Sequence, residues 1–171
     1  MPEFKTQDAI ALLKADHRTV EVLFEQFEKA KGEGKKEEIA RQICLELTVH
    51  ATIEEEIFYP ACEGKVEDDL LKEGYVEHDA AKIMIAEIEA ASGQGDEYFD
   101  AKVKVLKEEI EHHVQEEEQR ETGLFTQARK AGIDMDALRG QLAARKEELV
   151  ASYEASGLPK PELTTMQEVD V

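Results

Sequence analysis

Residues 44–60, CLELTVHATIEEEIFYP, decide how the chain folds because they place polar side chains on an otherwise apolar helix face. Apolar residues recur here and upstream at steps of three and four, the spacing that brings them to one face of a helix. His50 and Glu54 fall on that same face, one helical turn apart, where a buried helix would ordinarily carry leucines. A buried imidazole and a buried carboxylate need partners, so this face predicts a site as well as a core.

Three further segments carry the same kind of stripe, each with a histidine in it. Stripes with this heptad-like spacing are typical of helices that pack in bundles. Breaks rich in glycine or proline separate the segments at residues 31–36, 59–65, 91–96 and 130–134. The four stripes are Ile10, Leu13, His17, Val20, Phe24 and Phe27; Ile39, Ile43, Leu47, His50, Glu54 and Ile57; Leu71, Tyr75, His78, Ala81, Ile85 and Ile88; and Phe99, Val103, Leu106, Ile110, His113 and Glu117.

The stripes and breaks predict an all-α fold, with an up-down-up-down four-helix bundle over residues 1–130. We expect Pro60 to stop the second helix and Asp96 to cap the start of the fourth. Residues 131–157 predict an additional, shorter C-terminal helix packed on the outside of the bundle. Residues 158–171 contain two prolines and no sustained period, which predicts an extended or disordered tail.

Acidic side chains dominate the charge balance, with 40 Asp and Glu against 21 Lys and Arg and a formal net charge of -19. Phosphate backbones and anionic membrane surfaces repel such a chain, so neither nucleic acid nor a membrane is an expected partner. No stretch resembles a leader or a bilayer-spanning segment, so we expect a cytoplasmic protein. Cys44 and Cys62 fit neither a disulfide framework nor a cysteine zinc site, and we expect both to be reduced.

The histidines and glutamates on the stripes form a set that needs a shared partner. Left unpaired in the core, these groups would cost as much as the whole stability of a domain. Their number exceeds the four ligands of a structural zinc site and suits two ions of iron or manganese. Two Fe ions bridged by an oxo or hydroxo group are the expected cofactor, with Mn and Zn less favoured, and about two coordination positions would stay open for a small ligand. The expected metal ligands are His17, His50, Glu54, His78, His113 and Glu117.

Further polar residues near these positions are candidates for additional ligands or for supporting roles. Glu21 stands one turn after the first of the histidines, and Glu55 directly follows a ligand glutamate, so either could fill an open metal position. His112 lies one residue off the stripe, which assigns it to the surface or to a supporting role. Tyr59 and Tyr75 are expected to pack in the core, although a phenol near the metals could also ligate them or donate a hydrogen bond.

With these residues the chain resembles the hemerythrin-like, or HHE cation-binding, family over about residues 7–130. The stretches LKADHRTVEVLFEQFE, HATIEEEIFYP, VEHDAAKI and EHHVQEEEQRETGLF carry the resemblance, because they place H, HxxxE, H and HxxxE in order on four helices. The resemblance implies a four-helix bundle around a non-haem di-iron centre. It also implies that the six residues expected from the stripes are the iron ligands, with Glu54 and Glu117 as bridges.

The chain departs from the oxygen-carrying members that it resembles. Those members carry a further ligand histidine on the third helix, whereas Lys82 stands four residues after His78 here and Gly74 four residues before it. They also carry a ligand aspartate on the fourth helix, at a position one residue after the one that Glu117 occupies here. The resemblance therefore does not imply reversible dioxygen carriage.

Three kinds of function remain open on the sequence alone. The first is a binding protein that binds or senses O2, NO or peroxide, or that holds iron itself. The second is a di-iron enzyme that consumes peroxide or NO; peroxide disproportionation needs no reductant, whereas an oxidase would need a separate electron donor or partner protein. The third is a metal-free acidic interaction module, which predicts that the protein folds equally well without metal.

Overall fold

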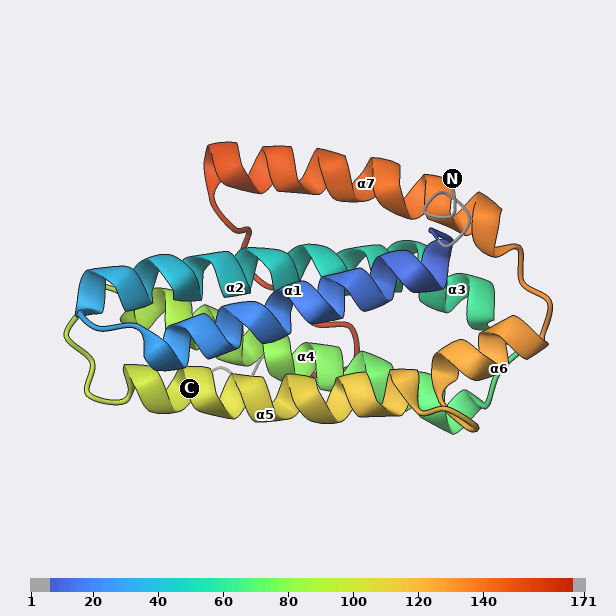
Figure 1. Cartoon of the computed structure of the whole chain (residues 1–171), viewed down its shortest axis with the longest axis horizontal. Helices are drawn as coiled ribbons and strands as arrows, with labels where there is room; N and C mark the ends of the chain where they lie inside the picture. The colour runs from blue at the N-terminus through green and yellow to red at the C-terminus, as the bar shows by residue number, and fades with distance from the viewer. Residues whose placement is uncertain (1–6, 168–171) are drawn as a thin grey trace.

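The computed structural model describes residues 7–167, and over that span the chain is mostly helical and forms no strand. Its elements are α1 (Ala9–Lys29), α2 (Glu33–Ile53), the π-helix η2 (Glu54–Phe58), α3 (Tyr59–Cys62), α4 (Asp68–Ala91), α5 (Phe99–Glu118), α6 (Leu124–Lys130) and α7 (Met135–Ser156). Helices α1, α2, α4 and α5 form the expected up-down-up-down bundle (Figure 1). The all-α prediction is thus confirmed. None of the described helices is both long enough and apolar enough to cross a bilayer.

Two apolar clusters fill the bundle, one on either side of a polar layer. Along α1, Leu13 belongs to one cluster and Val20 to the other, with His17 between them. The histidines of α2, α4 and α5 lie at the same level of the bundle as His17, and together they form the polar layer. Apolar packing therefore shields the polar layer at both ends, which raises the cost of any group in it that lacks a partner.

The second bundle helix does not stop at Pro60, contrary to the sequence-based expectation. Residues 54–58 form a π-turn, in which the Tyr59 N–H bonds to the Glu54 carbonyl, and α3 then carries Pro60 near its start. A proline is tolerated in the first turn of a helix because the N–H that it lacks would have no helical partner there. The π-turn lets the helix continue with one extra residue, and Glu54 and Glu55 lie within it.

The fourth bundle helix is shorter at both ends than the sequence predicted. Helix α5 begins at Phe99, and Asp96 instead accepts a hydrogen bond from the Tyr98 N–H in the preceding turn, with Oδ1 2.8 Å from the nitrogen. At its other end the chain turns at Gly123 before it continues as α6. A Cβ at Gly123 would collide with the backbone of Gln119, so only glycine fits this turn.

Helix α7 packs along the outside of α1 and α2, as predicted, but with 22 residues it is as long as the bundle helices (Figure 1). Asp134 caps its start by accepting a hydrogen bond from the Ala137 N–H at 3.0 Å. The apolar side chains of α7 pack into the apolar cluster that also contains residues of α3 and α6. These side chains are Met135, Leu138, Leu142 and Leu149.

After Gly157, where φ is 81°, the chain turns back over α2 and α4 (Figure 1). Residues 158–166, here called the C-terminal strap, have no helix or strand, as predicted, but they are docked on α4 through hydrogen bonds to Asp79. Residues 168–171 of the predicted tail lie outside the described residues. The division into units 1–130, 131–157 and 158–171 stays a prediction.

Candidate metal centre

Six buried histidine and glutamate side chains meet in the middle of the bundle, in two groups of three. In each group, one possible ligand atom per residue lies within 4.8 Å of the others. None of the six residues is more than 6% exposed. The groups are His17, His50 and Glu117, and Glu54, His78 and His113. The structure thus brings together every residue that the stripes singled out.

Two carboxylates connect the groups. Glu54 Oε1 lies 3.0 Å from His50 Nε2 and 3.2 Å from His78 Nε2, so it faces one imidazole of each group. Glu117 Oε1 makes the same connection between the other two histidines, at 3.2 and 3.4 Å from their Nε2 atoms. A carboxylate that faces both groups has the position of a bridging ligand.

Several of these carboxylate oxygens have no hydrogen-bond partner. Both oxygens of Glu54 and Oε1 of Glu117 are buried and accept no hydrogen bond from the described residues, because the short nitrogen contacts lie off hydrogen-bond geometry. A buried carboxylate without partners costs several kcal/mol. Carboxylate oxygens that lie close to imidazole nitrogens without accepting a hydrogen bond from them form an arrangement that a bound cation would complete. The residues present therefore fit a metal.

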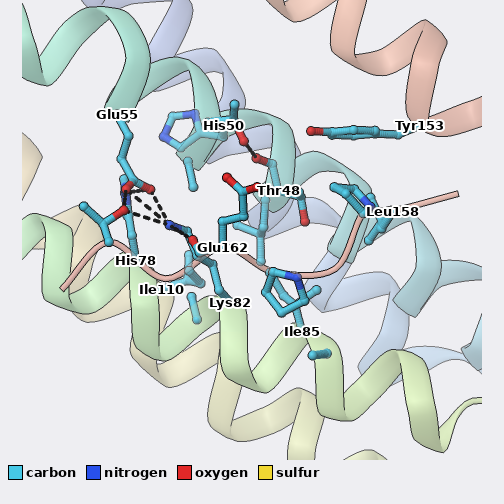
Figure 2. Close-up of a pocket in the computed structure, with 18 of the residues that line it drawn as sticks. Thr48, His50, Glu55, His78, Lys82, Ile85, Ile110, Tyr153, Leu158 and Glu162 are labelled. Atoms are coloured by element: carbon cyan, nitrogen blue, oxygen red, sulfur yellow. Dashed lines mark hydrogen bonds and ion pairs between the residues drawn. The ribbon is translucent and has the colours of Figure 1, made fainter. Parts of the chain in front are cut away.

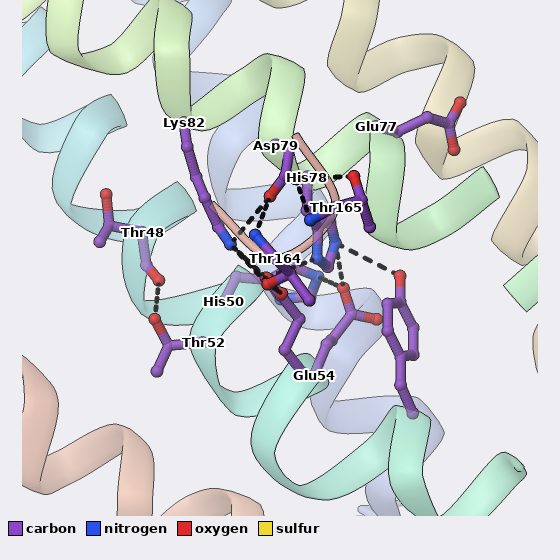
Figure 3. Close-up of polar contacts among 12 residues, drawn as sticks. Thr48, His50, Thr52, Glu54, Glu77, His78, Asp79, Lys82, Thr164 and Thr165 are labelled. Atoms are coloured by element: carbon purple, nitrogen blue, oxygen red, sulfur yellow. Dashed lines mark hydrogen bonds and ion pairs between the residues drawn. The ribbon is translucent and has the colours of Figure 1, made fainter. Parts of the chain in front are cut away.

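A second set of carboxylates holds the imidazoles from outside. The Nδ1 atom of each histidine faces a carboxylate oxygen, which can only accept, so Nδ1 carries a proton and Nε2 is the atom that would present its lone pair to a bound cation. Figure 3 shows part of this arrangement around His78. The pairs are His17 with Glu118 at 2.5 Å, His50 with Asp16 at 2.9 Å, His78 with Glu55 at 3.2 Å, and His113 with Glu77 at 2.8 Å.

These pairs close a ring, here called the outer carboxylate ring, in which each bundle helix supplies one imidazole and one carboxylate. A carboxylate on α1 contacts the histidine of α2, and one on the π-turn that follows α2 contacts the histidine of α4. A carboxylate on α4 contacts the histidine of α5, and one on α5 contacts the histidine of α1. Sequence reasoning missed Asp16, Glu77 and Glu118 in this role. Each directly follows or precedes an expected ligand. A helical neighbour points about 100° away, toward the next helix, and that signal could have found them.

The three additional candidates have different positions. Glu55 contacts His78 Nδ1 as part of the outer carboxylate ring. Glu21 is exposed and pairs with Arg18 at 3.2 Å, so it does not join the centre, contrary to one of the sequence-based expectations. His112 lies on the surface, as expected, with 65% of its side chain exposed and two glutamates beside it.

Tyr59 lies against the centre with its side chain fully buried. Its hydroxyl donates to Glu117 Oε2 at 2.8 Å and lies 3.3 Å from the Nε2 atoms of His78 and His113. Burial, together with the charges of the nearby glutamates, raises the pKa of Tyr59 well above its ordinary value. The phenol therefore keeps its proton and donates it to the carboxylate, which is one of the two roles considered from the sequence.

The structure explains Gly74 and Lys82, the residues that stand four positions before and four positions after His78. A Cβ at Gly74 would lie 3.0 Å from the Tyr59 hydroxyl, so glycine leaves the room that this ring occupies. Tyr75 packs edge-on against Tyr59, with ring centroids 5.1 Å apart, as expected of a packing residue. Lys82 turns away from the centre and pairs with Glu55 at 2.9 Å (Figure 3).

Charge balance within the centre raises the pKa of His17, His50 and His113 and lowers that of Glu54 and Glu117 when no metal is bound. Burial alone would lower the pKa of His50, but the charge of Glu54 and the hydrogen bond with Asp16 raise it to about 10. Burial likewise raises the pKa of Glu54, but the charge of His50 together with the contacts to His113 and His78 more than offsets this, so the pKa lies well below its ordinary value. A metal cation would take the place of the protons on these imidazoles.

A cavity of about 700 Å³ opens onto the imidazole side of the centre (Figure 2). All four histidines of the centre line it, together with Leu158 and Glu162 of the C-terminal strap. On the side of Tyr59 the gap is only about 10 Å³, smaller than the space one water needs. The cavity is therefore the broader approach to the centre. Its apolar walls include Val20, Leu47, Ala81, Ile85, Ile110 and Val114.

The fold and these residues define a four-helix-bundle protein with a buried histidine and glutamate site that fits a cation. The family model of the hemerythrin HHE cation-binding domain matches residues 8–124. This chain belongs to that family.

Two individual proteins are similar to it. A DNA nickase of a Nostoc species is 31% identical over 107 residues; the match covers 63% of this chain and 30% of the nickase, so the chain spans less than a third of that protein. A solved hemerythrin HHE cation-binding domain-containing protein of Mycobacterium kansasii is 20% identical, with a TM-score of 0.72 over 88% of this chain and 94% of that one. The second likeness supports the fold.

Proposed function

We propose that this protein holds two iron ions in the buried centre and uses them to bind or sense a small ligand such as O2, NO or peroxide. The observation that carries the proposal is that two groups of three ligand atoms share two carboxylates whose oxygens have no partner among the described residues. One ion per group, with Glu54 and Glu117 as bridges, uses all six side chains.

Iron is favoured by the number and the kind of ligands. Each ion would receive two imidazoles, a share of two carboxylates and a share of the bridging oxygen, which leaves about one of its six octahedral positions open, or about two in the pair. Zinc in a structural site is satisfied by four ligands in a tetrahedron, and two open positions would serve no purpose there. Bound iron supplies a redox-active Lewis acid with room for a small ligand.

The chain itself would contribute orientation, exclusion of water and a proton. The outer carboxylate ring fixes the imidazoles, and the two apolar clusters keep bulk water from the ends of the polar layer. The Tyr59 hydroxyl donates its proton to Glu117 Oε2, with the two oxygens 2.8 Å apart. These features support either a sensor or an enzyme.

Consumption of peroxide is the second candidate, and Tyr59 is the observation that favours it. A neutral phenol beside the centre can donate to an oxygen ligand and take the proton back. Two molecules of hydrogen peroxide give two of water and one of dioxygen, so the reaction needs no external electron donor. Loss of peroxide in the presence of the iron-loaded protein, and its slowing in Tyr59→Phe, would support this candidate.

Two other functions fit the molecule less well. We do not propose DNA cleavage for this protein on the basis of the nickase. The match covers only 30% of the nickase, and a net charge of -19 opposes contact with phosphates. A metal-free interaction module would leave the buried oxygens of Glu54 without a partner.

The test is an anaerobic titration of metal-free protein with Fe²⁺, followed by calorimetry. We expect two ions per chain for the wild type and a loss of binding in Glu54→Gln. Glu56→Gln is the matched control, because Glu56 lies on the same π-turn but faces outward to Arg145 at 2.8 Å. Equal binding by the two variants, or a wild type that binds no iron, would contradict the proposal.

A further inference from the structure

The C-terminal strap is clamped to α4 at the residue that follows His78. Asp79 is fully buried, and its carboxylate accepts hydrogen bonds from three consecutive backbone amides. The amides of Thr164, Thr165 and Met166 lie 2.9, 2.6 and 2.9 Å from its oxygens. The Thr165 hydroxyl adds a fourth bond at 2.7 Å (Figure 3). Consecutive amides that converge on one carboxylate form a specific contact, because several backbone donors must be placed together.

The same segment also contacts the outer carboxylate ring. The Thr164 hydroxyl donates to Glu55 Oε1 at 2.6 Å, and the other oxygen of Glu55 faces His78 Nδ1 at 3.2 Å. Lys82 ties the strap down a second time through the Glu162 carbonyl at 3.0 Å. The strap is therefore connected to an expected metal ligand through one side chain.

The C-terminal strap forms part of the wall of the cavity that leads to the imidazoles. Figure 2 shows Leu158 and Glu162 of the strap among the residues that line the cavity, together with His50 and His78. The cavity of about 700 Å³ is many times larger than a diatomic molecule, since a water molecule in the liquid occupies about 30 Å³. Residues of α2 and α4 line the same cavity, so the strap forms its wall alongside these two helices.

We propose that the C-terminal strap is a latch that selects by size which molecules reach the imidazole side of the centre, with Asp79, Thr164 and Thr165 as its fastening. The inference rests on the proposed function, because selection matters only if small ligands bind there. A segment near a chain end, held by a few hydrogen bonds, opens locally at a lower free energy than the bundle does. Small molecules reach the centre while the strap is docked, whereas larger ones reach it only when the strap detaches.

The first test compares two neutral probes of different size on iron-loaded, full-length protein. Thr165→Pro removes both the amide and the hydroxyl that Thr165 gives to Asp79. We expect this variant to lose iron to 2,2′-bipyridine at least tenfold faster than the wild type, while the association rate of NO with the reduced protein changes less than twofold. Unchanged extraction by bipyridine, or an equal acceleration of both probes, would overturn the proposal.

A milder variant and a matched control show whether the rate of iron extraction follows the number of bonds lost. Thr165→Val removes only the hydroxyl bond, so extraction should be faster by about fivefold, the effect of one hydrogen bond. Thr19→Val is the matched control, because the Thr19 hydroxyl is on the surface of α1 and bonds to the Ala15 carbonyl of its own helix. The control should extract at the wild-type rate. A rate for Thr165→Val equal to that of the control would count against the latch.

A second test needs no metal, so it separates failure of the latch from failure of the proposed function. Diethylpyrocarbonate modifies imidazoles, and mass spectrometry can follow His78 against the exposed His112 as an internal reference. In metal-free protein, Thr165→Pro should raise the ratio of His78 to His112 labelling at least tenfold over the wild type. An unchanged ratio would overturn the latch, whatever the iron content proves to be.

Discussion

His113 Nδ1 lies 2.8 Å from Glu77 Oε1, which is supplied by the neighbouring helix α4. The contact repeats around the bundle, so each imidazole of the centre depends on a carboxylate from another helix. The position of one histidine thus depends on the packing of two helices. Mutations outside the six expected ligands should therefore affect metal binding.

Removal of Glu77 should weaken metal binding although Glu77 is not an expected ligand. Loss of an outer partner of a ligand histidine typically costs about 10- to 100-fold in metal affinity. We expect Glu77→Ala to lower the affinity for Fe²⁺ by this factor, and Glu77→Gln, which keeps an acceptor, to lower it less. Glu73→Ala, on the exposed face of the same helix, is the control. An affinity for Glu77→Ala within twofold of the control would argue against the ring.

The adjacent histidines of α5 should behave differently. His113 is 5% exposed and lies in the centre, whereas His112 points to the surface. His113→Ala should lose most of the bound metal because one of the two groups loses a ligand, and His112→Ala should retain it. Metal content by elemental analysis distinguishes them. Equal losses would mean that the wrong face of α5 has been assigned to the centre.

The two helical glycines Gly74 and Gly140 should respond to alanine in opposite ways. Alanine in a helix interior is favoured over glycine by about 0.5–1 kcal/mol, and a Cβ at Gly140 would have no described atom within 4 Å apart from its own stretch of helix. Gly140→Ala should therefore raise the free energy of unfolding by about that amount. At Gly74 the new Cβ would press on the Tyr59 hydroxyl at 3.0 Å, and this buried ring cannot retreat without losing its bond to Glu117.

We accordingly expect Gly74→Ala to lower the free energy of unfolding, as measured by urea denaturation of the metal-free protein. A stabilisation as large as that of Gly140→Ala would show that Tyr59 has room to move, and that its contact with Glu117 is not tightly held.

Metal affinity should rise with pH across the neutral range. The pKa of His50 in the metal-free protein is raised to about 10, so a proton occupies the imidazole at neutral pH and the metal must displace it. The same protonation stabilises the metal-free fold fully below about 6.5 and is lost as pH rises through about 10. Calorimetry in buffers with different ionisation enthalpies should show proton release at pH 7. Affinity that does not change between pH 6 and pH 8 would contradict this.

The level of the centre could be predicted from the sequence because the stripe period places His17, His50, His78 and His113 inward on their helices. The outer carboxylates could have been proposed as neighbours of the ligands, but the histidine that each one supports could not be predicted, because the helix that faces each Nδ1 depends on how the helices rotate against one another. Glu118 supports His17 across 101 residues of sequence. A local sequence pattern cannot reveal a contact between residues so far apart in the chain.

The ends of elements were harder to predict for a related reason. The break at Gly123 depends on how closely the backbone of Gln119 approaches, and the docking of the strap depends on a buried Asp79 far away in the sequence. Both are tertiary contacts. The prediction of a tail without regular structure was correct about the strap's local conformation and gave no indication that it is docked on α4.

The central claim is tested most directly by the iron content per chain of protein purified without added metal and without an affinity tag. The account predicts two iron ions per chain by elemental analysis, and their loss in Glu54→Gln with the fold retained. A stably folded wild-type protein that contains no metal, or a single zinc ion, would contradict it.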